Sequence, residues 1–192
     1  LALQKIRGQT TFIPAASLPG GLRTSLCDEG YIAPARDGQH CVGASFVLHY
    51  DDLAPSEQEH LENLERIASM LPGARATLAG MEPGALHGRV GVRCASPDYL
   101  PLVGPVPDFE AFREQFGALR RNARKPIDKR GAYRPGLYLS TAHGSRGLTS
   151  TPLLAELLAR QVCGEAPPVS RQLARAVAPA RFIIRDLSRN RI

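Results

Sequence analysis

Alternating apolar and polar side chains dominate the N-terminal part of the chain, a period-2 pattern typical of half-buried strands. Such runs lie at residues 6–14, 22–27, 31–35 and 40–48. Asp37-Gly38 separates the last two runs and is a strong signal for a tight hairpin turn. Gly8 lies inside the first run, which indicates a point where another part of the backbone approaches the strand closely. The pattern predicts an antiparallel meander.

Helical periodicity replaces the alternation after Pro55. Ser56 can cap the first turn, and Glu59, three residues later, can complete a capping box. The apolar face of this helix holds Leu61, Leu64, Ala68 and Leu71. Pro72-Gly73 then ends it. Shorter patterns predict strands at residues 74–79 and 89–94 and a helix at 109–116.

The C-terminal part follows a strand–turn–helix pattern. A short apolar run at 136–140 predicts a strand, and residues 153–162 predict a helix that Gly164 ends. Residues 179–187 predict one more amphipathic helix. Because the strands outnumber the helices and come in a run, we expect an α+β fold: a mostly antiparallel mixed sheet flanked by helices, followed by the strand–turn–helix segment.

Composition sets limits on the class of protein. The chain has 192 residues, of which 43% are hydrophobic, and no apolar run reaches the ~20 residues that span a bilayer. Its four cysteines are scattered without C-x-x-C spacing, which favours reduced thiols in a cytoplasmic protein and predicts no metal site. Because the chain begins at Leu1 rather than at a Met, we expect a fragment or a processed product.

The charge is positive and unevenly distributed. Lysine and arginine number 24 against 18 acidic residues, a net charge of +6. The basic residues gather at 119–135, within a weakly periodic segment, and again from residue 159 onward. This clustering fits a polyanionic partner, and the alternative is a solvated surface with an arginine-rich composition.

A glycine-rich turn follows the predicted strand at 136–140. It comprises Gly144, Ser145, Arg146, Gly147 and Leu148. Backbone N–H groups project from such a turn without hydrogen-bond partners, and the following helix contributes the positive end of its dipole. The turn therefore suits a phosphate, a carboxylate or the electron-rich end of a cofactor. The alternative is an ordinary strand–turn–helix junction.

Three segments, in this order, carry a family resemblance: Arg7-Gly8-Gln9, residues 91–104 (GVRCASPDYLPLVG), and the turn at 144–147 with Pro152 behind it. Together with residues 31–34 and 42–45, they resemble the C-terminal half of FAD-dependent oxidases of the D-amino-acid oxidase and glycine oxidase type. Residues 40–45, 91–107 and 144–148 are more specifically similar to the oxidoreductase domains of bifunctional enzymes that modify the wobble uridine of tRNA.

This resemblance implies a substrate-binding sheet domain at residues 1–135. Residues 136–192 would complete an FAD-binding domain and carry the basic tail. The family grips the FAD pyrophosphate with an N-terminal G-x-G-x-x-G motif, which this sequence lacks. The resemblance therefore implies an incomplete FAD site, with the preceding FAD-binding and methyltransferase regions belonging to a longer protein.

The implied reaction removes the carboxymethyl group from 5-carboxymethylaminomethyl uridine, or its 2-thio form. Hydride leaves the CH2 beside the carboxylate for the flavin, and water hydrolyses the imine to glyoxylate and 5-aminomethyl uridine. In the intact protein, a separate domain would then methylate the amine with S-adenosylmethionine.

The resemblance also implies roles for individual residues. Arg93 would grip the substrate carboxylate, the alternative being an ion pair with Asp98. The turn at 144–148 would contact the flavin, with Ser145 where some relatives place a second substrate-binding arginine. His143 is a candidate general base and Tyr31 a candidate cleft residue, the alternatives being a structural histidine and a packing tyrosine. The residues expected to contact the tRNA anticodon arm are Arg121, Arg124 and Lys125.

Two alternatives to this function remain. One is an oxidase of the same class that acts on a small amino acid such as glycine or sarcosine. The other is a catalytically inactive RNA-binding module, because the motif that grips the ADP part of FAD is absent from the sequence.

Overall fold

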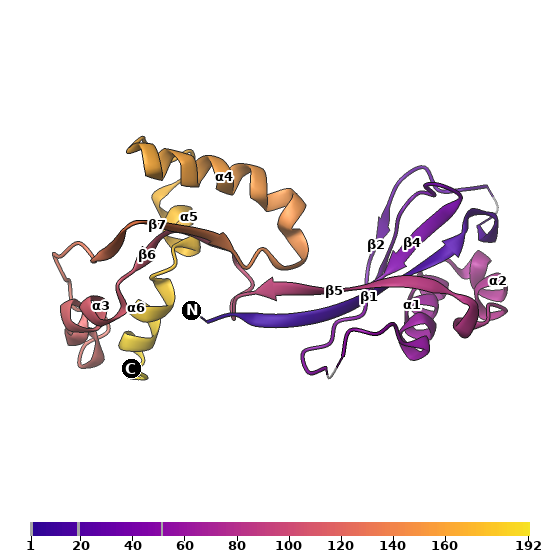
Figure 1. Ribbon diagram of the computed structural model, residues 1–192, viewed down its shortest axis with the longest axis horizontal. Helices are drawn as coiled ribbons and strands as arrows, with labels where there is room; N and C mark the ends of the chain where they lie inside the picture. Colours follow the sequence, from indigo (N-terminus) through magenta and orange to yellow (C-terminus); the bar gives the residue numbers. More distant parts are fainter. Residues whose placement is uncertain (1, 19, 51) are drawn as a thin grey trace. The chain divides into compact units, whose positions relative to one another are not determined.

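The computed structural model describes residues 2–18, 20–50 and 52–192 (Figure 1). Contacts within the chain divide it into two units. Lys5–Arg93 form one unit, and Cys94–Ile192 together with the first residues up to Gln4 form the other. This division after Arg93 differs from the predicted functional division after residue 135, which separates a substrate-binding part from an FAD-binding part. The functional division stays a prediction.

The Lys5–Arg93 unit is built on a five-stranded sheet. Its strands are β1 (Gln4–Pro14), β2 (Leu26–Cys27), β3 (Tyr31–Ile32), β4 (Gln39–Gly43) and β5 (His87–Ala95), in the order β2-β3-β4-β1-β5. β2 pairs with β3, β3 with β4 and β4 with β1, all antiparallel. In this register Phe12 lies opposite Cys41 and Ile32 lies opposite Val42. The antiparallel meander β2-β3-β4 is confirmed with strands shorter than predicted, whereas β1 is longer than its predicted run at residues 6–14.

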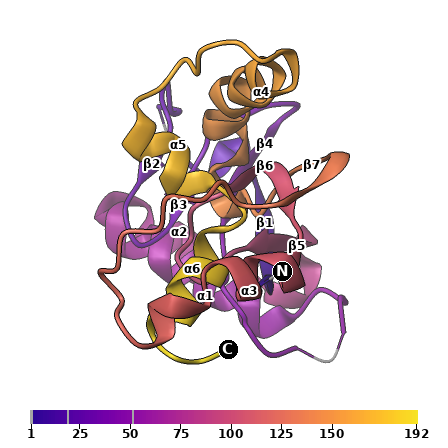
Figure 2. The same ribbon diagram turned by 90° about the vertical axis from the view of Figure 1, so that its left-hand side faces the viewer.

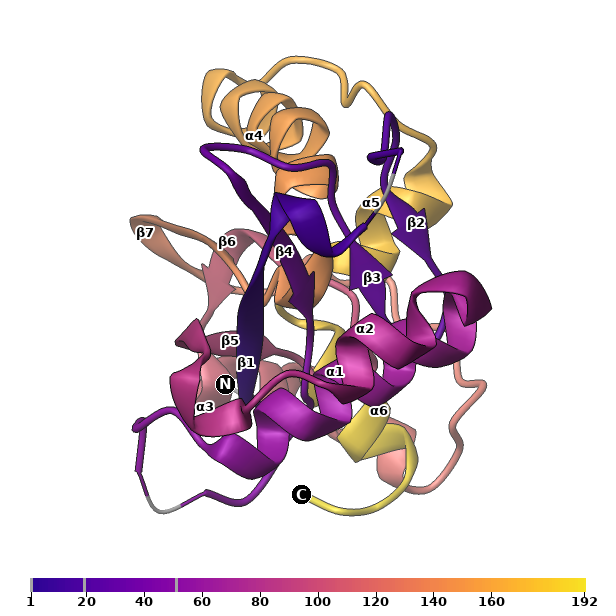
Figure 3. The ribbon, with the colours of Figure 1, turned by 90° about the vertical axis from the view of Figure 1, so that its right-hand side faces the viewer.

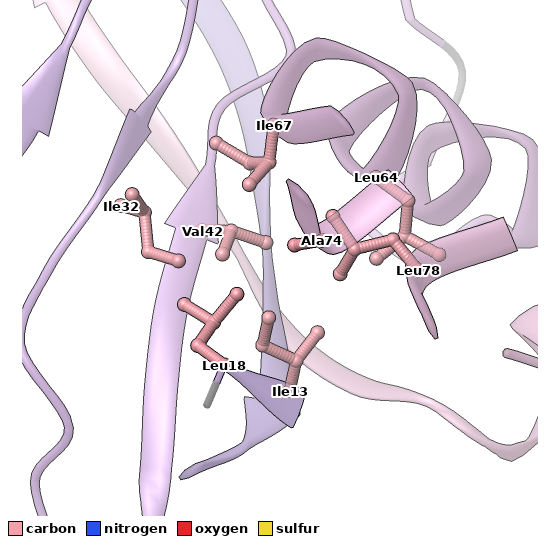
Figure 4. Close-up of a cluster of buried hydrophobic side chains, with 8 residues drawn as sticks. All are labelled: Ile13, Leu18, Ile32, Val42, Leu64, Ile67, Ala74 and Leu78. Atoms are coloured by element: carbon pink, nitrogen blue, oxygen red, sulfur yellow. The ribbon is translucent and has the colours of Figure 1, made fainter. Parts of the chain in front are cut away.

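Helices α1 (Glu57–Met70) and α2 (Arg75–Ala79) cover one face of this sheet (Figure 3). The core between them holds Ile13, Leu18, Ile32, Val42, Leu64, Ile67, Ala74 and Leu78 (Figure 4). Successive strand residues point to opposite faces. Since Ile13, Ile32 and Val42 face the helices, their neighbours Phe12, Tyr31 and Cys41 belong to the opposite face.

Two local predictions in this unit are wrong. Residues 74–79 form α2 rather than a strand, because the 3-10 turn Pro72–Ala74 leads directly into a segment of good helix formers that buries only Leu78. The capping box at α1 does not form either. Ser56 occupies the N-cap position without a side-chain cap, and Glu59 turns inward to contact Arg7 and Ser45.

The second unit contains a two-stranded antiparallel sheet with helices around it (Figure 2). The strands are β6 (Leu102–Pro107) and β7 (Tyr133–Thr141), and the helices are α3 (Phe109–Gln115), α4 (Gly147–Cys163), α5 (Arg171–Val177) and α6 (Arg181–Ser188). One core cluster joins β6 to α4 and α5, and it holds Val103, Leu154, Leu157 and Val177. A second cluster holds Leu102, Ala142 and Phe182.

The predicted elements of this unit are mostly confirmed. α3, β7 and α6 match the predicted helix at 109–116, strand at 136–140 and helix at 179–187. α4 begins at Gly147, earlier than predicted, and includes Pro152 in its second turn. β6 and α5 were not predicted. The fold is α+β, as expected, and no helix in the described part of the chain is long and apolar enough to cross a membrane.

Candidate functional site

Arg93 lies half-buried on β5, and its guanidinium rests against Gly8 of β1. A Cβ atom at Gly8 would lie 2.2 Å from Nη1 of Arg93 and 2.7 Å from Cζ. Nη1 also donates a long hydrogen bond, 3.4 Å, to the backbone oxygen of Ser45. The close approach at Gly8 is therefore made by the Arg93 side chain, and not by backbone as predicted. Only a residue without a side chain leaves room for it.

A buried polar network supports the segment that receives Arg93. The Ser45 hydroxyl donates to Glu59, and the same carboxylate pairs with Arg7. These side chains are almost fully shielded: Arg7 is 4% exposed and Glu59 8%. The Gln9 N–H donates to the Ser45 hydroxyl at 2.8 Å, which ties β1 to the same network. A buried carboxylate and guanidinium hold each other in place, because neither has water as an alternative partner.

The face of the sheet opposite the helices carries a cavity of about 490 Å³. It is lined by Gly8, Thr10, Phe12, Cys41, Arg89, Val90, Gly91, Val92 and Arg93. Arg93 and Arg89 belong to the same strand, and neither forms an ion pair within the described part of the chain. Arg89, Phe12 and Cys41 were not among the predicted site residues, although their alternation on β5, β1 and β4 placed them on one face.

Tyr31 lies beside this cavity, next to Cys41. Burial raises the pKa of the Tyr31 phenol above its ordinary value, and Cys41 adds to the rise while Arg93 opposes it. Burial likewise raises the pKa of the Cys41 thiol. Both groups are therefore neutral at neutral pH, and the charge of the cavity is that of its arginines. The role of Tyr31 as a cleft residue stays a prediction that this position supports.

The glycine-rich turn connects β7 to α4. Ala142 and Gly144 adopt positive φ angles of 61° and 56°, and Gly144–Arg146 form a 3-10 turn before α4 begins at Gly147. Leu148 in the first turn of the helix is 98% exposed. The first N–H groups of a helix have no partner within it, so they point out of this turn.

A cavity of about 330 Å³ lies against this turn. It is lined by Tyr99, Leu100, Pro101, His143, Gly144, Ser145, Arg146 and Ser150. The turn and α4, which has 17 residues, would give this cavity a positive electrostatic potential from the backbone. Tyr99, which has a positive φ of 57°, was missed by the sequence analysis.

His143 has hydrogen bonds at both ring nitrogens. Nε2 lies 3.0 Å from the Ser140 hydroxyl and Nδ1 lies 3.2 Å from the Ser150 hydroxyl. Because the Ser150 hydroxyl donates to the Arg146 oxygen at 3.0 Å, it accepts from Nδ1, and Nε2 accepts from Ser140. This arrangement favours a histidine that fixes the turn. Its role as a general base stays a prediction.

Arg181 of α6 holds the loop that carries Tyr99. Its Nε and Nη2 donate to Asp98 at 2.9 and 2.8 Å, and Nη2 also donates to the Leu100 oxygen at 2.8 Å. The hydrogen bonds from Arg181 hold the pKa of Asp98 well below its usual range. The carboxylate considered as an alternative partner of Arg93 is thus engaged by Arg181 in a two-pronged ion pair.

The basic segment after α3 forms part of a third cavity, of about 960 Å³. Its lining includes Arg113, Glu114, Arg120, Arg121, Asn122, Lys125 and Asn190. Gly117–Arg120 form a 3-10 turn, and Arg120 donates to the backbone oxygen of Ile192 at 2.6 Å. The structure brings Arg121 and Lys125 together here, whereas Arg124 is not part of the lining.

The fold that carries this sheet and this glycine turn is shared with FAD-dependent oxidases. The chain belongs to the FAD dependent oxidoreductase family, whose model matches residues 1–161. Glycine oxidase from Geobacillus kaustophilus shares the fold with a TM-score of 0.64 at 20% identity, over 93% of this chain and 39% of that one. Iminodiacetate oxidase from Chelativorans aligns with a TM-score of 0.57 at 22% identity, over 88% of this chain and 38% of that one.

Closer relatives are found by sequence. The tRNA 5-methylaminomethyl-2-thiouridine biosynthesis bifunctional protein MnmC of Chromobacterium violaceum is 47% identical over all of this chain and 29% of its own length. The protein of the same name from Pseudomonas putida is 46% identical over all of this chain and 30% of its own length. The chain thus spans less than a third of these relatives. The resemblance predicted from residues 40–45, 91–107 and 144–148 is confirmed.

The residues present fit the part of the FAD site that this family builds from its C-terminal segment. Gly144 and Gly147 place no side chain in front of the turn, and a Cβ at Gly144 would meet only Ala95, at 3.9 Å. The backbone N–H groups at the start of α4 would hold the electron-rich edge of the flavin ring. This part of the chain contributes no G-x-G-x-x-G motif for the pyrophosphate.

Proposed function

We propose that this chain is the substrate-binding and C-terminal part of an FAD-dependent amine oxidoreductase acting on tRNA. The reaction removes the carboxymethyl group from 5-carboxymethylaminomethyl uridine, or its 2-thio form, at the wobble position. The products are 5-aminomethyl uridine and glyoxylate. The observation that carries the proposal is Arg93, held by Gly8 and Ser45 in a cavity on the open face of the sheet without an ion-pair partner among the described residues.

Arg93 anchors the substrate through its carboxylate. A guanidinium binds a carboxylate with two parallel hydrogen bonds, which fixes the orientation as well as the position of the adjacent CH2. When bound, FAD supplies the acceptor for the hydride that leaves this CH2. Holding the reacting carbon in one place is worth several kcal/mol of the barrier in general. Water then hydrolyses the resulting C=N bond of the substrate.

The turn at 144–148 supports the electron-rich edge of the cofactor. With the cofactor bound, the preorganised N–H groups at the start of α4 would face this edge and would stabilise negative charge without having to reorient. His143 keeps the turn in shape through its contacts with Ser140 and Ser150.

The basic residues are proposed to bind the RNA backbone. Arg121 and Lys125 line the cavity after α3, and Arg124 lies in the same segment. Contacts of this kind position a nucleic acid without identifying its sequence, and each releases counterions, so binding weakens as salt is added. A cytoplasmic location, where tRNA is found, is part of the same proposal.

The test uses the full-length protein that contains these 192 residues, purified with its flavin. We expect it to release glyoxylate from tRNA that carries the carboxymethylaminomethyl group. Arg93→Ala should lose about 100-fold or more in kcat/KM, since the reacting carbon is no longer anchored. Arg36→Ala, in an exposed turn of the same unit, is the matched control and should retain full activity.

A second measurement addresses the partner. Replacing Arg121 and Lys125 together with Ala should weaken tRNA binding and reduce the slope of log affinity against log salt by about 2. An unchanged slope would reject their role. Oxidation of free glycine or sarcosine in place of the modified tRNA would favour the small-amino-acid oxidase, and a purified full-length protein without flavin absorbance would favour the inactive RNA-binding module.

A further inference from the structure

We propose that Arg89 is a second anion anchor in the open-face cavity. Arg93 binds the carboxylate of the modified uridine nucleotide, and Arg89 binds a phosphate of the same nucleotide. This inference rests on the proposed function, because it concerns the substrate of that site. It assigns the cavity a preference for a nucleotide over a free nucleoside or amino acid.

The position of Arg89 carries the first part of the argument. Residues 89, 91 and 93 of a strand point to the same face, and all of them line the cavity. At about 3.3 Å per residue, the Cα atoms of Arg89 and Arg93 are roughly 13 Å apart. The Arg93 guanidinium is fixed at one end, against Gly8. A second anion held by Arg89 therefore lies at the other end, at a distance that suits two groups of one nucleotide.

The space between the arginines is open. A Cβ atom at Gly91 would meet nothing within 4 Å, so no side chain divides the cavity between Arg89 and Arg93. The volume of about 490 Å³ is in the range of sites for small ligands. Phe12 provides an aromatic surface in the same cavity, and aromatic side chains are typical partners for nucleic-acid bases.

The charge of the cavity also supports a second bound anion. Its lining contains no acidic residue, and neither arginine has an ion-pair partner within residues 2–18, 20–50 and 52–192. Tyr31 and Cys41 remain neutral, since burial raises the pKa of each. A single carboxylate would neutralise only one of the two guanidinium groups. A ligand with a carboxylate and a phosphate matches both.

The backbone of Arg89 is tethered to the neighbouring strand. The Thr10 hydroxyl donates to the Arg89 oxygen at 3.4 Å, and Thr10 lines the same cavity. The side chain of Arg89 is exposed, so it can reach an anion that enters from solvent. The planar guanidinium with its fork of donors matches the geometry of a phosphate.

The experiment compares substrates that differ only in phosphate. The full-length flavoprotein is assayed with 5-carboxymethylaminomethyl uridine as the free nucleoside, as its 5′-monophosphate and as its 3′-monophosphate. We expect one monophosphate to have a KM lower than that of the nucleoside by about 10- to 100-fold, the effect of hydrogen bonds to a charged group. The monophosphate that is preferred identifies which phosphate Arg89 binds.

Variants then assign the effect to Arg89. Arg89→Gln should remove the preference by raising KM for the preferred monophosphate more than KM for the nucleoside. Arg89→Lys should restore part of it, because lysine keeps the charge but not the two-pronged geometry. Arg36→Gln is the control, an exposed arginine of the same unit that lies outside the cavity.

Several results would overturn the inference. The wild-type protein could oxidise nucleoside and monophosphates with equal KM, or Arg89→Gln could lower activity on all of them equally, as a structural defect would. Either result leaves the proposed function intact, because the uridine compounds are still oxidised. If the wild type oxidises glycine but none of the uridine compounds, the proposed function itself fails.

Discussion

Replacing Gly8 with alanine tests whether the contact between β1 and Arg93 positions the substrate. The added methyl group would lie 2.2 Å from Nη1 of Arg93, whereas ordinary contacts of a Cβ atom begin at 3.4 Å. The guanidinium must therefore retreat by about 1 Å or more. A misplacement of that size commonly costs about 100-fold in rate. We expect kcat/KM for the modified tRNA to fall by that factor in Gly8→Ala.

The fold should tolerate this substitution, because the atoms that clash are at the end of a flexible side chain and alanine is less costly than glycine within a strand. The free energy of unfolding should change by about 1 kcal/mol or less. Gly73→Ala is the control, since a Cβ atom there meets nothing within 4 Å. Steady-state assays of glyoxylate release and urea unfolding give the two quantities. A Gly8→Ala protein with kcat/KM within about twofold of wild type would refute the reasoning.

Two further predictions concern the ion pairs of the two units. Glu59→Ala leaves Arg7 charged and buried, so the free energy of unfolding, measured in urea, should fall by about 3–5 kcal/mol. The double variant Arg7→Met/Glu59→Leu should recover part of this loss. A loss below about 1 kcal/mol would indicate an exposed pair instead. Asp98 has a folded-state pKa below its unfolded value near 4, so its contribution to stability is present above about pH 4 and is lost as the pH falls below that. The Asp98→Asn variant should therefore be less stable than wild type at neutral pH and should lose less stability as the pH falls. Urea unfolding of both proteins across the pH range measures this difference. An equal dependence of stability on acid pH in the variant and in wild type would contradict the prediction.

Sequence patterns predicted most of the regular elements, since alternation and helical periodicity report which side chains are buried. The prediction failed at residues 74–79, where a short segment buries only Ala74 and Leu78 and so shows neither period clearly. It also failed at β6, because Gly104 and two prolines interrupt the apolar pattern. In both places the element is defined by its neighbours: α2 continues a turn after α1, and β6 pairs with β7.

The candidate site was predicted in part, and the resemblance supplied most of it. Arg93 and the turn at 144–148 were identified from motifs, and the structure adds that Gly8 makes the space for Arg93. Arg89 was not identified, because a lone arginine on an alternating strand is ordinary until the cavity beside it is known. Glu59 was assigned to a helix cap, since its distant partners, Arg7 and Ser45, cannot be found from local spacing.

The alternation of β5 constrains how this protein can vary. Arg89 and Arg93 share a face only because they lie four positions apart, an even offset, along an extended strand. Inserting or deleting one residue between them would turn one arginine toward the helices and leave the other in the cavity. A change in the length of this strand would therefore divide the pair of anion-binding groups.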